Sequence, residues 1–254
     1  MLDVILSGGE IFDGSGARSY VADIGIEGER IACIGKLDDV QATERIDASG
    51  LGVSPGFIDL HTHSDFTLLV NGRAESQVHQ GVTTEATGQC GHSCAPVRNR
   101  AEAKQGAIGY TEDSGVALDW ESFGEYLEHL ERNPLGVNVA AFVGHGAIHR
   151  AIMGDALRTP AIEETRTMTA LLDEAFDQGA YGFSTGLEYW PGNVCAPEHI
   201  IPLCEVAARR DRLYATHVRN RDLYYDLGFG EALSTARNAS ARLQISHIQP
   251  KYGA

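Results

Sequence analysis

Apolar positions in the first 52 residues form short runs that are separated by tight turns. Residues 4–6 predict one strand, with a turn at Gly8 and Gly9, and residues 23–26 and 30–34 predict a hairpin across Gly28. This stretch has no convincing helical period. A segment of this size is too small to be stable alone. The pattern therefore predicts a small β-module over residues 1–52.

From about residue 51 onward, apolar runs alternate with helical patterns. Six runs have the length and composition of buried strands, at residues 53–60, 81–86, 137–143, 179–184, 212–216 and 242–246. Strands that alternate with helices indicate a parallel sheet with the helices outside it. Residues 53–254 are therefore expected to form one α/β domain.

The start and stop signals of the helices place most of them between these strands. Asp119 is expected to cap a helix that runs to Leu130, and Thr159, followed by proline, is expected to begin another. Pro197 predicts the start of a third helix, and residues 230–238 predict a shorter one. Residues 98–115 are rich in glycine and charged residues. This composition predicts either a loop over the top of the sheet or a plain solvated insertion.

Composition and charge narrow the classes of partner. The chain has 254 residues, 43% of them hydrophobic, and a net charge of −15. This charge argues against nucleic acid or an anionic membrane surface as a partner, because both need clustered lysine and arginine. The five cysteines are scattered and odd in number, the first residues do not form a signal peptide, and no stretch has the ~20 apolar residues of a membrane span. We therefore expect a cytoplasmic protein that acts on a small molecule.

Metal-binding residue types follow the predicted strands. In a (β/α) barrel the chemistry takes place at the carboxyl ends of the strands. Alternate residues of a strand face the same way, so His61 and His63 project together after the first run. Cys90 follows the second run, and His217 and His247 follow the fifth and sixth. Imidazole and thiolate ligands suit zinc, although a lone histidine often serves structure and a lone cysteine is most often a small buried hydrophobe.

Five motifs carry a resemblance to a known family. The sequence Pro-Gly-Phe-Ile-Asp-Leu-His-Thr-His-Ser-Asp at 55–65 looks like the first strand of the amidohydrolase superfamily. The other motifs lie at residues 81–91, 183–189, 216–220 and 245–247, and with the first they resemble the N-acyl-D-amino-acid deacylases, or D-aminoacylases. The resemblance runs over the whole sequence. It implies an α/β fold, a TIM-like (β/α) barrel, and a small N-terminal β-module that is part of an incomplete β-sandwich.

The resemblance also implies a set of metal ligands. Cys90 stands where the deacylases have a bridging cysteine, and with His217 and His247 it is expected to hold one tight zinc ion. His61 and His63 belong to a second, weaker metal position by the same resemblance.

The sequence departs from the family pattern at one point. The family closes its barrel with two more strands and uses an aspartate at the end of the eighth as general base, whereas only six strands are predicted before Ala254. We therefore expect an incomplete barrel, a missing C-terminal segment or a second chain that supplies the rest, and little activity of residues 1–254 alone.

The expected reaction is zinc-dependent hydrolysis of N-acyl-D-amino acids, which releases a carboxylate and a D-amino acid. Lys251 and Arg219 lie in strand-end loops where they can attract a substrate carboxylate, or they are simply solvated; Tyr189 is a further contact, and His145 can orient a ligand or the substrate. Two alternatives remain open. One is a cyclic-amide hydrolase of the hydantoinase or dihydroorotase type, and the other is a non-catalytic partial barrel.

Overall fold

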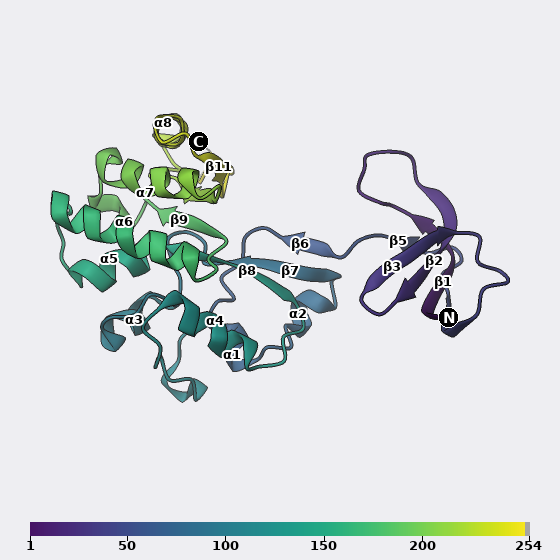
Figure 1. Cartoon of the computed structure of the whole chain (residues 1–254). Helices are drawn as coiled ribbons and strands as arrows, with labels where there is room; N and C mark the ends of the chain where they lie inside the picture. Colours follow the sequence, from purple (N-terminus) through teal and green to yellow (C-terminus); the bar gives the residue numbers. More distant parts are fainter. Residues whose placement is uncertain (252–254) are drawn as a thin grey trace. The chain divides into compact units, whose positions relative to one another are not determined.

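A computed structural model describes residues 1–251, apart from the side chains at positions 102 and 105. It divides into two compact units, Met1–Phe57 and Ile58–Ala254 (Figure 1). The assignment of residues 1–52 and 53–254 as separate domains stays a prediction.

The first unit is a five-stranded sheet. Its central strand β1 (Leu2–Ile11) pairs antiparallel with β2 (Tyr20–Glu27), and β2 pairs antiparallel with β3 (Arg30–Gly35), which is the predicted hairpin. Two further strands, β4 (Ala42–Asp47) and β5 (Gly52–Val53), run parallel to β1. The buried apolar side chains of this unit are Ile5, Ile11, Ile24, Leu37 and Ala48.

The predicted turn at Gly8 and Gly9 is wrong, because both residues lie inside β1. The pairing register of β1 with β2 shifts between Leu6 and Gly9, and Gly8 has a φ of 70°. The side chain of Asp23 accepts a hydrogen bond from the Gly8 N–H at 2.8 Å. The glycines therefore form a bulge that bends the strand without ending it.

The second unit contains a six-stranded sheet with the strand order β11-β10-β9-β8-β7-β6. Each of the six predicted runs overlaps a strand of this sheet, although the first run, 53–60, also includes Val53 of β5. The pairs from β7 to β11 are parallel. The expected incomplete (β/α) barrel is therefore confirmed. The strands are β6 (Phe57–Asp59), β7 (Val82–Thr87), β8 (Asn138–Gly144), β9 (Gly182–Gly186), β10 (Leu213–His217) and β11 (Arg242–Ile245).

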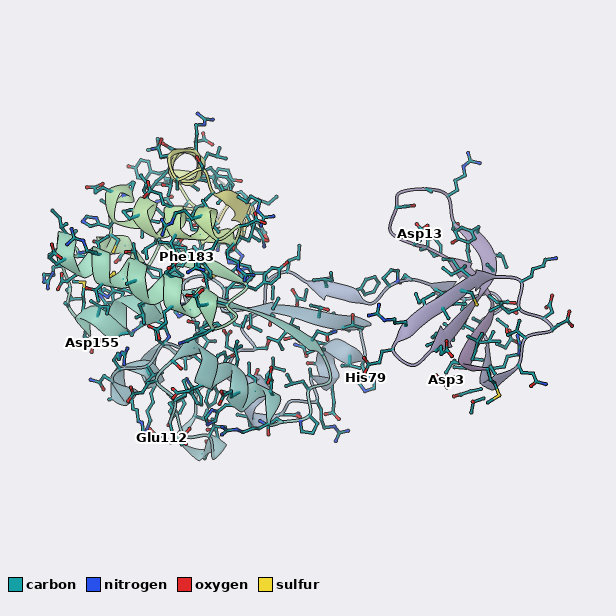
Figure 2. The ribbon with its side chains drawn as sticks, viewed as in Figure 1. Asp3, Asp13, His79, Glu112, Asp155 and Phe183 are labelled. Atoms are coloured by element: carbon teal, nitrogen blue, oxygen red, sulfur yellow. The ribbon has the colours of Figure 1, made fainter. Side chains whose placement is uncertain are left out.

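Helices pack against this sheet and bury the main core. Figure 1 shows α6 (Ile162–Asp177) and α7 (Pro197–Arg209) side by side, and these two helices are in contact. Phe183 of β9 is fully buried in this unit, whereas Glu112 and Asp155 are exposed at its surface (Figure 2). The other helices are α1 (Thr67–Val70), α2 (Glu75–Val78), α3 (Arg100–Gly106), α4 (Phe123–Glu131), α5 (His145–Met153) and α8 (Tyr225–Asn238), with 3₁₀ turns η1 (Glu112–Ser114) and η2 (Gly192–Val194).

Two predicted helix caps are wrong. The N-cap of α4 is Ser122, whose hydroxyl accepts from the Glu125 N–H, while Asp119 pairs with His129 at 3.0 Å. Ser122 and Glu125 form a capping box, in which each side chain accepts a hydrogen bond from the other residue's backbone N–H, so the helix does not need a cap from Asp119. Helix α6 begins at Ile162 and not at Pro160, after an extended residue 161.

One helix was not predicted, and another lies where a loop was expected. Helix α5 begins immediately after β8, and α3 lies within residues 98–115. The start of α7 at Pro197 is confirmed, and α8 begins earlier than residue 230. Within residues 1–251, no helix combines the length and the apolar character that crossing a bilayer requires.

Candidate metal centre

The carboxyl ends of parallel strands bring distant residues to one rim of the sheet. Strands β7, β10 and β11 end at Thr87, His217 and Ile245, and the predicted ligands follow within a few residues of these ends. The imidazole of His247 lies 4.5 Å from that of His61 and 4.8 Å from that of His217, measured between ring centroids. Segments that are far apart in sequence therefore meet at this rim, as the strand-end rule predicts.

Three donor atoms converge on one point. The Sγ atom of Cys90 lies 3.3 Å from Nε2 of His61 and 3.2 Å from Nε2 of His247. One ligand atom from each of these residues lies within 4.8 Å of the other two. The resemblance predicts that Cys90 and His247 share one metal site, and the structure brings these two residues together. His61, which the resemblance assigns to the second position, lies in the same group.

The turn that carries Cys90 is built from glycines. Cys90 has a φ of 55°, and Gly88 and Gly91 on either side have φ of 74°. A side chain on Gly91 would place its Cβ 2.7 Å from the backbone nitrogen of Gly186. The backbone therefore winds tightly here and passes close to β9, which turns the thiol toward the histidines.

Burial sets the protonation of these groups. It lowers the pKa of His61 and of His247 to about 4, with the neighbouring imidazoles adding to the shift, so both rings are neutral at pH 7. Burial raises the pKa of the Cys90 thiol to about 11. The centre therefore offers two neutral imidazoles and one thiol that must lose its proton to become a good ligand.

The donor set fits a divalent metal ion. Nδ1 of His61, His63 and His217 is buried without a hydrogen-bond partner among the described residues. Buried imidazole nitrogens without a partner are costly unless something else occupies them. Two imidazoles and a thiol around one point are ligands that zinc prefers.

His63 and His217 lie beside the trio of His61, Cys90 and His247 and not within it. The ring of His63 lies 5.3 Å from that of His61. Nε2 of His217 lies 2.6 Å from a carboxylate oxygen of Glu188. Which histidines join Cys90 in a tight site and which form a weaker one stays a prediction.

The predicted substrate residues differ in their surroundings. The hydroxyl of Tyr189 donates to the Cys90 carbonyl oxygen, and its ring stacks on His92 at 5.3 Å. Nζ of Lys251 lies 2.7 Å from Glu188, near the rim. Tyr189 therefore lies next to Cys90, whereas Lys251 is connected to His217 through Glu188. A role for either residue in binding substrate stays a prediction.

Arg219 and His145 are engaged elsewhere. The Arg219 guanidinium pairs with Glu231 at 2.8 Å and donates to the carbonyl of Cys195 at 2.6 Å. His145 is buried, with Nε2 at 3.7 Å from the Cys195 thiol. A role for either residue in binding substrate stays a prediction, since the Arg219 donors are used within the fold.

Sequence reasoning missed the role of Glu188. The residue lies in the motif at 183–189, but nothing in that motif indicates that its carboxylate contacts both His217 and Lys251. The position of Glu188 directly after a strand, among basic residues of other strand ends, is the signal that was available.

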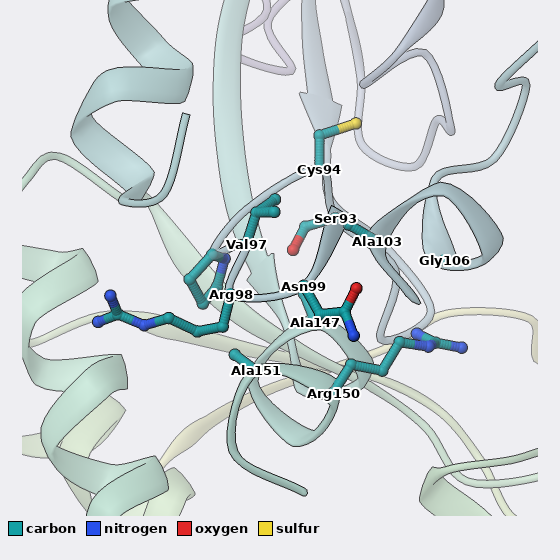
Figure 3. Close-up of a pocket in the computed structure, with 11 residues that line it drawn as sticks. Ser93, Cys94, Val97, Arg98, Asn99, Ala103, Gly106, Ala147, Arg150 and Ala151 are labelled. Atoms are coloured by element: carbon teal, nitrogen blue, oxygen red, sulfur yellow. The ribbon is translucent and has the colours of Figure 1, made fainter. Parts of the chain in front are cut away.

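A separate cavity lies behind the rim. Its lining includes Ser93, Cys94, Asn99, Ala147 and Arg150 (Figure 3). Its volume of about 10 Å³ is close to the minimum for one water molecule. It contains none of the metal-binding trio, and it is too small for a substrate.

Comparison with known proteins identifies the family. The model of the amidohydrolase family matches residues 44–196. The chain therefore belongs to the amidohydrolase family, as its motifs predict.

The similar proteins within this family are deacylases. A D-aminoacylase of Alcaligenes xylosoxydans xylosoxydans is 39% identical over 255 residues, which cover 99% of this chain and 52% of the relative. A structure of N-acyl-D-glutamate deacylase from Bordetella bronchiseptica, complexed with zinc and a phosphonate inhibitor, is 35% identical with a TM-score of 0.88 and covers 97% of this chain and 51% of that one. The predicted resemblance to the deacylase branch is confirmed.

One further structure bears on the number of metals. A D-aminoacylase described as having a binuclear metal centre is 37% identical, with a TM-score of 0.88, over 97% of this chain and 52% of that one. The chain thus spans about half the length of the relatives it matches.

Proposed function

We propose that this rim binds zinc and that the protein hydrolyses the amide bond of N-acyl-D-amino acids. Water adds to the acyl carbon, the carbon–nitrogen bond breaks, and a carboxylate and a D-amino acid leave. The observation that supports this most is the Cys90 thiol, which lies within 3.3 Å of two imidazole nitrogens. The similar deacylases point to the same substrate class.

The residues of this chain have distinct roles in the proposal. His61, Cys90 and His247 would hold the metal, which when bound supplies Lewis-acid activation of water and of the substrate carbonyl. His63 and His217 lie close enough to complete this site or to form the weaker second one. Lys251 would attract the substrate carboxylate at the rim, and Tyr189 would limit the space beside Cys90.

Zinc titration of three proteins tests the metal site. The wild type is expected to bind zinc. Cys90→Ala should bind zinc more than about 100-fold more weakly, because it loses a direct metal ligand. Cys33→Ala should bind zinc as the wild type does. Cys33 is the matched control because it is an exposed free cysteine of the first unit. Equal zinc binding by the wild type and Cys90→Ala would disprove the assignment.

A substrate panel tests the reaction. N-acetyl-D-amino acids are expected to be hydrolysed faster than their L-enantiomers and faster than hydantoins. Preference for hydantoins would support the cyclic-amide alternative instead. Zinc binding without turnover of any of these substrates would favour the non-catalytic barrel.

A further inference from the structure

Glu188 lies at the meeting point of three strand ends. It follows β9, and the backbone next to it is fixed by a hydrogen bond of 2.9 Å from the Leu187 N–H to the His217 carbonyl at the end of β10. Its side chain is only 20% exposed. Glu188 therefore faces the rim from a rigid position.

Each oxygen of the Glu188 carboxylate has its own partner. Oε2 lies 2.6 Å from Nε2 of His217, and Oε1 lies 2.7 Å from Nζ of Lys251. Nε of Arg221 lies 3.9 Å from Oε2 and adds a second positive charge. The Lys251 ammonium and the Arg221 guanidinium both favour the ionised form of this carboxyl group. The side chain is therefore an anion, which can only accept hydrogen bonds.

This contact determines the tautomer of His217. Because the carboxylate accepts, Nε2 of His217 must carry the hydrogen, and a neutral ring then has its lone pair on Nδ1. Nδ1 is itself buried without a hydrogen-bond partner among residues 1–251. The ring lies 4.8 Å from that of His247, so this free nitrogen belongs to the metal-binding rim.

We propose that Glu188 is a positioning residue of the metal centre: its carboxylate holds His217 in the tautomer that offers Nδ1 to the metal and ties this imidazole to Lys251. The inference rests on the proposed function. It adds a physical link between the metal and the side chain expected to attract the substrate. A carboxylate that orients a ligating histidine typically contributes 10–100-fold to metal affinity.

Cobalt(II) titration of a mutant cycle tests the link. Glu188→Ala is expected to weaken cobalt binding 10–100-fold. Glu188→Gln is expected to recover most of this loss, because its amide oxygen still accepts from Nε2. In a His217→Ala background, Glu188→Ala is expected to cause no further loss. Lys251→Met removes the ammonium and leaves the contact between Glu188 and His217 intact. It should bind cobalt within about threefold of the wild type, because an ion pair whose lysine is 37% exposed contributes little.

A second measurement needs no variant. The ¹⁵N shifts of the His217 ring in the wild-type protein should report a neutral ring with hydrogen on Nε2. Hydrogen on Nδ1, or a loss with Glu188→Ala that is as large in the His217→Ala background, would overturn the inference. If the inference about Glu188 fails but cobalt binding still depends on Cys90, the proposed metal site remains supported. Cobalt binding that does not depend on Cys90 would disprove the proposed function itself.

Discussion

Two regions of the second unit each place a buried cysteine beside a histidine. At the rim, Cys90 lies within 3.3 Å of Nε2 of both His61 and His247. Beneath helix α5, Cys195 has one imidazole neighbour, His145, at 3.7 Å. Burial raises the pKa of both thiols to about 11. Burial and an imidazole neighbour are thus common to both regions, and only the convergence of three donors distinguishes the rim.

The second cluster takes part in contacts that hold the fold together. The Cys195 carbonyl accepts from Arg219, which also pairs with Glu231, so this region fixes η2 and α8 to the end of β10. The fully buried ring of His149 is packed against His145 and Trp190. We therefore expect the cluster under α5 to stabilise the fold and the rim to bind metal.

The largest expected difference between the clusters is in the pH dependence of zinc binding. Between pH 6 and pH 9, His61 and His247 stay neutral because their pKa is about 4, and the Cys90 thiol stays protonated because its pKa is about 11. Each zinc ion bound as a thiolate complex then releases one proton, so affinity should rise about tenfold per pH unit, or about 1,000-fold over this range. Competition titrations with a chelator of known affinity measure this slope. A slope near zero would show that no thiolate forms.

Removing a histidine from each cluster sharpens the comparison. His61→Ala and His247→Ala are each expected to lower zinc affinity more than about 100-fold, because each removes a first ligand. His145→Ala, the matched change in the other cluster, should leave zinc affinity within a few-fold. Equal losses in all three variants would mean that both clusters bind metal or that the fold is lost. Circular dichroism of each variant shows whether the fold is kept and so distinguishes these two explanations.

The charge at Lys251 gives a smaller effect that concerns substrate only. Lys251→Met should raise KM for an N-acetyl-D-amino acid about tenfold, as expected for the loss of about 1.4 kcal/mol of binding, and should change zinc affinity little. The same change should not affect an N-acyl-D-amino-acid amide, which has no carboxylate to attract. A rise in KM that is equal for the acid and the amide would contradict this role.

The smallest effect is expected at Cys195. Cys195→Ala should lower the free energy of unfolding by about 1 kcal/mol, since it removes one buried sulfur from a packed region. Zinc affinity should stay at the wild-type value. Chemical denaturation of the zinc-free proteins measures the first quantity, and a loss of zinc binding in this variant would contradict the comparison.

Strands β9 and β10 could be predicted because they are buried along almost their whole length, and the other runs because turn signals bound them. All six runs became strands, and Pro197 was recognised as a helix start. Helix α5 was missed because its first residues, His145 and Gly146, follow β8 without any polar cap. The bulge at Gly8 was missed because two adjacent glycines look the same in a turn and in a bent strand.

The site was predictable to the level of residue types at strand ends. Cys90, His61 and His247 meet as the strand-end rule requires. The position of His217 depends on a hydrogen bond to Glu188, and such a contact between loops of different strands leaves no periodic trace in the sequence. The use of Arg219 within the fold could not be predicted either, because its acceptors are Glu231, twelve residues away, and backbone carbonyls, which any sequence supplies.

Cobalt(II) spectroscopy tests the central claim, that the Cys90 sulfur is a ligand of the bound metal. The wild type and Cys195→Ala, each loaded with cobalt, should both show the near-ultraviolet charge-transfer band of a thiolate–cobalt bond. This band should be absent from Cys90→Ala. A band of wild-type intensity in Cys90→Ala would contradict the account.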